Sequence, residues 1–148
     1  MNRFLVTGGA GFIGSNICRR LVSEGYFVRV IDNLITGKKS NLDDIINNIE
    51  FVEADIGDSD VVKELLKDID IILHQAALSS VPRSIADPVP THKHCVDATF
   101  SLLINARDAG IKRFVYAASS SAYGSNEVLP KIETLSTSPI SPYAVGKL

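Results

Sequence analysis

Short apolar runs alternate along the chain with longer segments in which apolar residues recur every three or four positions. The runs predict buried strands, and the longer segments predict helices with one apolar face. Because strand and helix alternate, and crossovers in such units are right-handed, the pattern predicts an α/β fold with a doubly wound parallel sheet of five strands in the order 3-2-1-4-5. Strands are expected at residues 4–6, 27–32, 49–54, 70–74 and 114–118, and helices at 12–24, at 42–46, after a cap at Asp58 or Ser59, and at 91–109.

The apolar spacing also predicts which helix faces are buried. In the first helix Ile13, Ile17 and Leu21 share one face. Residues 79–90 carry three prolines and are expected to form a loop. In the long helix that follows this loop, the residues expected to point inward are Val96, Phe100, Leu103 and Ala106.

A glycine-rich stretch, residues 6–14, joins the first strand to the first helix. Gly8, Gly11 and Gly14 fit one form of the dinucleotide-binding fingerprint, and Gly9 with the last two fits another. Such glycines allow a tight turn, a close approach of the backbone to a pyrophosphate, and close helix–strand packing. The pyrophosphate would rest on backbone N–H groups at the helix start. The alternative is an ordinary glycine-rich turn.

Acidic residues follow the second and third strands. Asp32 ends the second strand, where an acid accepts hydrogen bonds from the adenosine ribose and repels a 2′-phosphate, so it favours NAD over NADP. Asn33 and Gly37 suit the alternative, an aspartate that starts a turn. Asp55-Ile56 ends the third strand and would flank the adenine. Gln75-Ala76-Ala77 follows the fourth strand, where small residues let a cofactor lie against the backbone.

Composition narrows the function classes. The 148 residues suggest one domain, and 45% hydrophobic with 22% charged residues is an ordinary globular composition. With a net charge of -2 and no basic cluster beyond two adjacent residues, neither nucleic acid nor a membrane surface is an expected partner. Cys18 and Cys95 lack metal-ligand spacing, so no disulfide and no metal site are expected. Without a leader or a long apolar segment, we expect a cytoplasmic protein.

Candidate catalytic groups lie near the end of the chain. The run 119–121 places serines just after the fifth strand. Tyr143 and Lys147 are four residues apart on an expected helix that Ser141 caps and Pro142 begins. A tyrosine is a poor proton acceptor at neutral pH, but a neighbouring ammonium favours its phenolate. The alternative is an ordinary surface pair on a helix.

Taken together, these motifs resemble the extended short-chain dehydrogenase/reductases, in particular the nucleotide-sugar epimerases and dehydratases. With the serine run, residues 80–84 (Ser-Val-Pro-Arg-Ser) look most like UDP-hexose 4-epimerases, including those that act on N-acetylated hexosamines. The resemblance spans the whole chain and rests on Thr7-Gly8-Gly9-Ala10-Gly11-Phe12-Ile13-Gly14, Asp32-Asn33, Asp55-Ile56, His74-Gln75-Ala76-Ala77, Asp87-Pro88, Ser119-Ser120-Ser121, Tyr123-Gly124 and Ser141-Pro142-Tyr143-Ala144-Val145-Gly146-Lys147.

The resemblance implies a Rossmann domain that binds NAD, and a nucleotide-sugar substrate. Tyr143 would take the proton of the sugar 4-hydroxyl, Ser119 would hydrogen-bond the 4-oxygen, and Lys147 would hold the nicotinamide ribose. Residues implied for cofactor binding are Gly8, Gly11, Phe12, Ile13, Gly14, Asp32, Asn33, Thr36, Gly37, Asp55, Ile56, Gln75, Ala76, Ala77, Tyr143 and Lys147; those implied for the substrate are Ser79, Arg83, Ser120 and Ser121.

The sequence departs from the family pattern in several places. Cys95 stands where an asparagine is usual, and Gly146 where serine or threonine is usual. Dehydratases carry Asp and Glu where this chain has Ser120 and Ser121, so dehydration is disfavoured. Family members also continue beyond residue 148 into a substrate region. We therefore expect residues 1–148 to form an incomplete NAD-binding domain that is inactive alone, with a frayed final helix.

Dimerisation through the long and catalytic helices, which the resemblance also implies, would be weakened because the catalytic helix is short. Two other readings stay open. One is a non-catalytic module that binds NAD or a partner, and the other is a dehydratase or reductase of the same family.

Overall fold

The computed structural model describes residues 1–148, and the chain divides into two compact units. The first comprises Met1–Ala76 and Ala98–Tyr116, and the second comprises Ala77–Asp97 and Ala117–Leu148. The first unit holds the sheet, and the second holds short helices and loops. None of the helices combines the length and the apolar character that are needed to cross a membrane.

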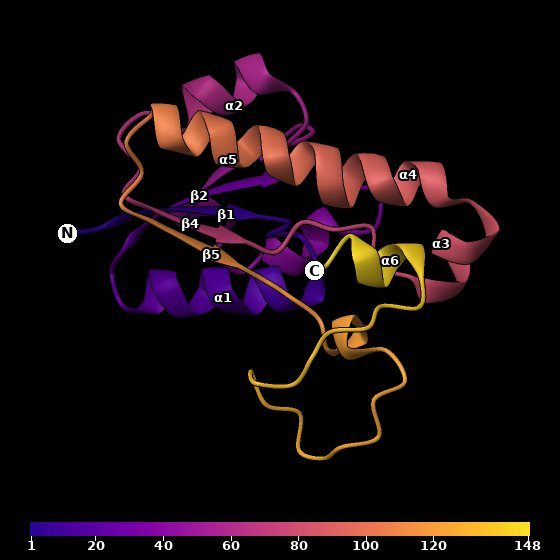
Figure 1. The fold of residues 1–148 in the computed structure, drawn as a ribbon. Helices are drawn as coiled ribbons and strands as arrows, with labels where there is room; N and C mark the ends of the chain where they lie inside the picture. Colours follow the sequence, from indigo (N-terminus) through magenta and orange to yellow (C-terminus); the bar gives the residue numbers. More distant parts are fainter. The chain divides into compact units, whose positions relative to one another are not determined.

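The sheet of the first unit has five strands, all paired in parallel, in the order β3-β2-β1-β4-β5 (Figure 1). This confirms the order expected from the alternating pattern. Thr7 lies beside Ile31 on one side and beside His74 on the other, so the ends of β1, β2 and β4 meet at one edge. The strands are β1 (Arg3–Thr7), β2 (Phe27–Asp32), β3 (Glu50–Glu53), β4 (Ile71–His74) and β5 (Arg113–Tyr116).

Helices cover both faces of this sheet. Helix α1 (Phe12–Ser23) lies on one face, and α2 (Ser59–Leu65) and α5 (Ala98–Asp108) lie on the other (Figure 1). Successive side chains of a strand point to opposite faces, so Leu5 and Val6 enter different cores. The core under α2 and α5 contains Leu5, Ile31, Ile56, Val62, Leu65, Leu66, Ile69, Ile72, Ala98, Leu102 and Ala106; the core under α1 contains Val6, Ala10, Cys18, Leu21, Val28, Val30, Leu42 and Ile45.

The expected inward face of the long helix is wrong for Phe100 and Leu103, which are 65% and 43% exposed. The buried residues of α5 are Ala98, Leu102, Asn105 and Ala106. A single π-helical turn, η3 (Lys93–Asp97), precedes α5. Such a turn inserts one extra residue, so apolar spacing counted from Val96 does not continue into α5 with the same phase.

The expected face of α1 is wrong at its first member, because Ile13 is 62% exposed. The buried residues are Gly14, Ser15, Cys18 and Leu21, so the stripe begins on small residues. The residue at position 14 must be glycine, because a Cβ there would lie 2.2 Å from the carbonyl oxygen of Gly8. The helix therefore packs its first turn directly against the glycine-rich turn.

Other expected elements are adjusted in detail. The short helix expected at 42–46 is replaced by two 3-10 turns, η1 (Lys39–Leu42) and η2 (Ile46–Asn48). Asp58 is the residue that caps α2, because its side chain accepts hydrogen bonds from the N–H groups of Asp60 and Val61.

The second unit contains helices where a loop was expected. Helices α3 (Val81–Ala86) and α4 (Pro88–His92) lie within or across residues 79–90. The prolines fall in their first turns, where a missing N–H costs nothing, and Ser80 and Asp87 cap them. The unit also holds η3, the 3-10 turn η4 (Ser120–Tyr123) and α6 (Pro142–Val145).

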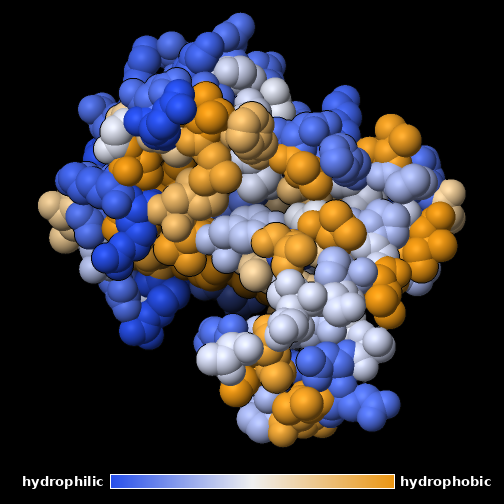
Figure 2. Space-filling view, viewed as in Figure 1, coloured by the Kyte–Doolittle hydropathy of each residue, from blue (hydrophilic) through white to orange (hydrophobic).

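Strand β5 is the last strand on its side of the sheet, and its burial pattern leaves Arg113 and Val115 exposed. Val115 is 43% exposed. Figure 2 shows apolar side chains at the surface on the β5 side of the sheet, seen from the same direction as Figure 1. The surface at β5 therefore exposes apolar side chains to solvent.

Candidate functional site

The glycine turn of the first unit has the close contacts that its sequence predicts. Gly8 has a φ of +67°, and a Cβ on it would lie 2.6 Å from the backbone nitrogen of Ala76. Its own N–H donates to the carbonyl oxygen of Ile31 at 2.8 Å. A side chain at Gly8 or Gly14 would therefore collide with the backbone, so close packing requires glycine at both positions. A Cβ on Gly9 would lie 2.5 Å from Cγ1 of Val30, so the contacts allow both forms of the fingerprint.

The start of α1 can receive an anion. Gly11 is its N-cap and provides no side-chain hydrogen bond, and the first turn carries no acidic residue. The N–H groups of a first helical turn have no partner within the helix, and the helix dipole favours negative charge there. Phe12 and Ile13 are exposed at this end of the helix. These features fit a pyrophosphate.

Asp32 is held in place by the backbone on both sides. It is 7% exposed, and its two carboxylate oxygens accept hydrogen bonds from Ala10 N and Leu34 N, each at 2.9 Å. A Cβ on Gly37 would lie 2.9 Å from this carboxylate, so a glycine there lets the loop pass close by. Each oxygen has a further lone pair, so the carboxylate can still accept the hydroxyls of a ribose.

Asp55 is tied to the same edge of the sheet. It accepts a hydrogen bond from the side-chain amide of Asn33 at 2.7 Å and another from the N–H of Gly57 at 2.7 Å. The ends of β2 and β3 are thereby linked by side chains. Ile56 is buried in the core, and Thr36 is exposed in the loop beyond Asn33. These two hydrogen bonds fix the orientation of the Asp55 carboxylate.

Small residues follow β4 at the same edge. Gln75 donates its backbone N–H to Thr7 O at 3.1 Å, which continues the pairing of β1 and β4 by one residue. Ala76 then lies against Gly8, as the contacts above require. Ala77 begins the second unit.

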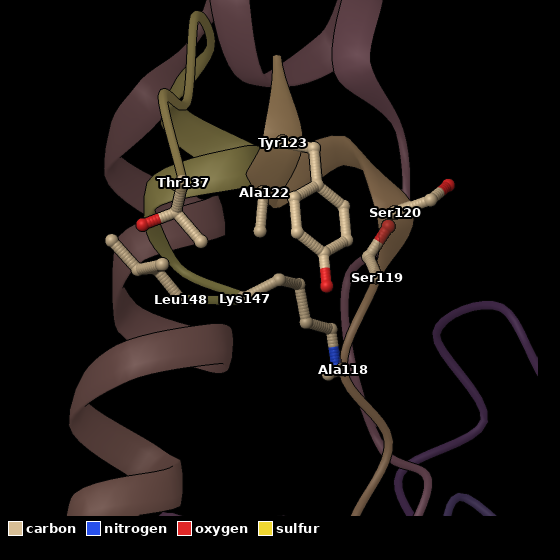
Figure 3. A pocket seen from close by; sticks show the side chains of 8 residues that line it. All are labelled: Ala118, Ser119, Ser120, Ala122, Tyr123, Thr137, Lys147 and Leu148. Atoms are coloured by element: carbon tan, nitrogen blue, oxygen red, sulfur yellow. The ribbon is translucent and has the colours of Figure 1, made fainter. Parts of the chain in front are cut away.

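The second unit contains a cavity of about 420 Å³, which Figure 3 shows with its lining side chains. Ser119 and Lys147, two of the three residues expected to be catalytic, face it together. Ser120 also lines the cavity, whereas Tyr143, Ser121, Ser79 and Arg83 are not among its lining residues. The lining consists of Ala118, Ser119, Ser120, Ala122, Tyr123, Thr137, Lys147 and Leu148.

Ser119 is oriented by its own turn. It is the N-cap of η4, and its Oγ accepts a hydrogen bond from Ser121 N at 3.2 Å. Because this bond uses a lone pair and not the hydroxyl proton, the proton remains available for donation to a ligand oxygen. The run of serines therefore gives one oriented donor in the cavity, Ser119, with the exposed Ser120 beside it.

Lys147 is buried, with 4% of its surface exposed, and its Nζ donates to the carbonyl oxygen of Ala117 at 2.8 Å. Burial lowers the pKa of this ammonium below its usual value, and the nearby Cys95 opposes that shift. Helix α6 ends at Val145, so Lys147 lies in the turn after the helix and not on it, which corrects the expected helical pair. Tyr143 lies within α6 and is partly buried.

The two departures from the family pattern are neighbours. A Cβ on Gly146 would lie 3.1 Å from the Cβ of Cys95. Glycine therefore lets the turn that carries Lys147 approach η3 closely. The side chain of Cys95 is 2% exposed.

Tyr123 and Thr137 line the cavity but were not among the expected site residues. Figure 3 shows the phenol of Tyr123 directed toward the side of the cavity where the Ser119 hydroxyl and the Lys147 amine lie. Gly124 follows with a φ of +58°, and Ser138 N donates to Ala122 O at 2.9 Å. That contact brings residues 136–139 beside the serine run. For Tyr123 the sequence offered a signal, because this aromatic residue lies two positions after the serines and directly before Gly124.

The sequence matches the NAD dependent epimerase/dehydratase family over residues 4–148. It is 41% identical over 150 residues to a UDP-glucose 4-epimerase of Mycolicibacterium smegmatis, covering 99% of this chain and 48% of that protein. The chain spans about half the length of the curated relatives it matches.

Two solved structures illustrate the likeness in fold. One is a UDP-N-acetylglucosamine 4-epimerase from Methanobrevibacter ruminantium in complex with UDP-N-acetylmuramic acid, with a TM-score of 0.92, 39% identity, and coverage of 99% of this chain and 47% of that one. The other is a dTDP-glucose 4,6-dehydratase from Streptomyces venezuelae with NAD bound, with a TM-score of 0.93, 38% identity, and coverage of 98% and 48%. The family match over nearly every residue, together with the glycine turn, Asp32 and the serine run, shows that the chain belongs to the NAD-dependent epimerase/dehydratase family.

Proposed function

We propose that residues 1–148 are the NAD-binding domain of a UDP-sugar 4-epimerase, and that this chain binds NAD without turning over a sugar by itself. The proposal that this chain contributes catalytic residues is supported by one observation. Ser119 and Lys147 line the same cavity, and each is fixed by its own hydrogen bond. The 4-epimerases among the relatives and solved structures support the substrate class.

The first unit supplies the groups that would hold the adenosine and pyrophosphate parts of NAD. The first turn of α1 would receive the pyrophosphate, because its N–H groups and dipole favour an anion. Asp32 would accept the hydroxyls of the adenosine ribose, and Asp55, which accepts a hydrogen bond from the Asn33 amide, would flank the adenine. Asp32 would also repel the extra phosphate of NADP.

The second unit supplies the groups proposed for proton transfer. When bound, NAD supplies a hydride acceptor for carbon 4 of the sugar and later returns the hydride to the opposite face. Tyr143 would accept the proton of the 4-hydroxyl, and the Ser119 hydroxyl would donate a hydrogen bond to the same oxygen. Lys147 would bind the nicotinamide ribose, and its positive charge would favour the phenolate of Tyr143.

Two side chains favour epimerisation over dehydration. Removal of water from carbons 5 and 6 needs an acid and a base beside the sugar. At the two positions after Ser119 this chain carries Ser120 and Ser121, whose hydroxyls are poor acids and bases at neutral pH. The dehydratase relative is similar in fold, and the choice of reaction rests on these side chains.

The test is to add NAD and then UDP-glucose or UDP-N-acetylglucosamine to the purified chain. We expect saturable NAD binding and no product. Failure of a folded sample to bind NAD would remove the proposed cofactor site. Formation of the 4-epimer would contradict the proposed inactivity. Formation of a 4-keto-6-deoxy sugar would show that the chain belongs to a dehydratase and not to an epimerase.

A further inference from the structure

A buried chain of hydrogen bonds runs through the first unit beside the glycine turn. Thr7 Oγ1 lies 2.6 Å from His74 Nδ1, and His74 Nε2 lies 2.9 Å from Thr99 Oγ1. Thr7 ends β1, His74 ends β4 and Thr99 lies in α5, so the chain joins two central strands to a covering helix (Figure 1). Thr7 and His74 are both 0% exposed, so water does not reach the bond between them, whereas Thr99 at the other end is half-buried.

The donor and the acceptor in each of these hydrogen bonds follow from the groups around Thr7. Its Oγ1 accepts the backbone N–H of Ala76 at 3.2 Å. Because the other neighbour of this buried hydroxyl is His74 Nδ1, that nitrogen is the acceptor available for its proton. Nδ1 must therefore carry no proton. The imidazole is then neutral with its proton on Nε2, from which it donates to Thr99 Oγ1.

The packing around the ring supports this neutral state. The imidazole stacks on Tyr116 at an interplanar angle of 29° and packs edge-to-face with Phe114 at 61°, with ring centroids 5.6 Å away in both cases. Both neighbours lie on β5 and place aromatic carbon against the ring. A second proton on the imidazole would be buried there and would break the bond to Thr7.

The same hydroxyl controls the geometry of the glycine turn. Gly8 follows Thr7 directly, and the backbone of Gly8 lies so close to Ala76 that a Cβ on Gly8 would be 2.6 Å from Ala76 N. The N–H of that same Ala76 is the group that Thr7 binds. Together with the bond from Gln75 N to Thr7 O at 3.1 Å, the hydrogen bond from Ala76 to Thr7 therefore holds the ends of β1 and β4 together at the point where the pyrophosphate is proposed to bind.

We propose that His74 is a positioning residue for the cofactor: as the neutral imidazole with its proton on Nε2, it orients the Thr7 hydroxyl, which holds the glycine turn against Ala76 in its pyrophosphate-binding shape. This inference rests on the proposed NAD-binding function. His74 itself touches no part of the cofactor in this account, and it acts through Thr7.

The first test replaces the Thr7 hydroxyl with a methyl group of the same size. Thr7→Val leaves the Ala76 N–H and His74 Nδ1 without their partner, and we expect ADP to bind about tenfold more weakly. Adenosine, which lacks the pyrophosphate, should bind Thr7→Val as it binds the unchanged chain. Thr91→Val is the matched control, because Thr91 is 1% exposed and its hydroxyl has no hydrogen-bond partner. Both affinities should be unchanged in this control.

Equal ADP affinity of Thr7→Val and the unchanged chain would overturn the proposal. So would an equal loss for adenosine and ADP, since that result would mean a general structural defect. If the unchanged chain binds neither NAD nor ADP, the proposed function fails instead. The two failures are therefore distinguishable.

The second test reads the protonation state of His74 in the unchanged chain and uses a variant only to assign its signal. Nitrogen-15 NMR of the imidazole groups distinguishes a nitrogen that carries a proton from one that accepts a hydrogen bond. The chain has three histidines, so a spectrum of His74→Gln identifies the signal of His74 by its absence. We expect a protonated Nε2 and an unprotonated Nδ1 at neutral pH, and the opposite tautomer or a doubly protonated ring would overturn the proposal.

Discussion

Lys147 is a buried cation with a lowered pKa, and this has a consequence for stability. Since desolvation lowers the pKa in the folded state, the unfolded chain binds more protons between the folded pKa and the usual value of 10.5. Stability should therefore rise with pH across that window through this group. The buried charge opposes folding at lower pH, and raising the pH relieves that cost.

Lys147→Met removes this titration, so the unchanged chain should gain stability relative to the variant as the pH rises toward 10.5. Urea unfolding at a series of alkaline pH values measures the difference. Because both proteins keep every other titrating group, subtraction isolates Lys147. A difference that stays constant with pH, or moves the other way, would contradict the burial of the charge.

Cys18 is a buried thiol, and burial raises its pKa to about 12. The thiolate is the reactive form, so Cys18 should resist a water-soluble thiol reagent in the folded chain and react rapidly in urea. The Cys95→Ser variant leaves Cys18 as the single cysteine for this measurement. Equal labelling rates in the folded and the unfolded chain would show that Cys18 is accessible.

At the residue scale, the sequence predicted the side chains that repeat the family's motifs, and missed those that reach the cavity through folding. Ser119 and Lys147, chosen for the chemical roles of their motifs, both line the cavity, and their roles stay predictions. Thr137 could not, because it reaches the cavity only through the contact of Ser138 with Ala122. Tyr143 remains a prediction, because the cavity is lined without it.

At the element scale, the turn between β1 and α1 depends on glycine at two points. Gly14→Ala would place a Cβ 2.2 Å from Gly8 O and 2.7 Å from the Cα of Gly9. Because the obstacle is backbone, we expect a loss of about 3 kcal/mol in stability and loss of NAD binding. Thermal unfolding and NAD titration measure the two effects.

Gly25→Ala is the control for this substitution. Gly25 also requires glycine for its backbone, with a φ of +81°, but no atom lies within 4 Å of a Cβ built there. The expected cost is about 1 kcal/mol with NAD binding unchanged. If Gly14→Ala behaved like Gly25→Ala, the proposed role of the turn in binding would be wrong.

Helix α6 depends on its cap because it is only four residues long. Ser141 Oγ accepts the N–H of Ala144 at 3.1 Å, and Ser141 is buried. Ser141→Ala should cost about 1 kcal/mol and loosen the turn that carries Lys147. Hydrogen exchange of the amides of residues 144–148 would report this, and unchanged protection there would mean that the cap does not hold the helix.

Element positions followed from periodicity wherever helices and strands were regular. The phase of α5 did not, because the π-helical turn η3 changes the register without changing the composition. Helices α3 and α4 were missed for a related reason. Their prolines read as loop residues, although proline suits a first helical turn.

At the scale of the whole molecule, the strand order was the most predictable feature. It follows from alternating strand and helix segments and from right-handed crossovers, neither of which depends on exact boundaries. The match to the family over residues 4–148 agrees with it. Division into two compact units was not predictable from composition, since no linker-like segment marks Ala77 or Ala117.

The central claim is that this chain carries an NAD site in which Asp32 selects against NADP. Calorimetric titration of residues 1–148 with NAD and with NADP tests it most directly. We predict saturable binding of NAD, and binding of NADP weaker by about tenfold or more, because the Asp32 carboxylate would meet the 2′-phosphate. Binding of neither nucleotide by the folded chain, or equal binding of both, would contradict the account.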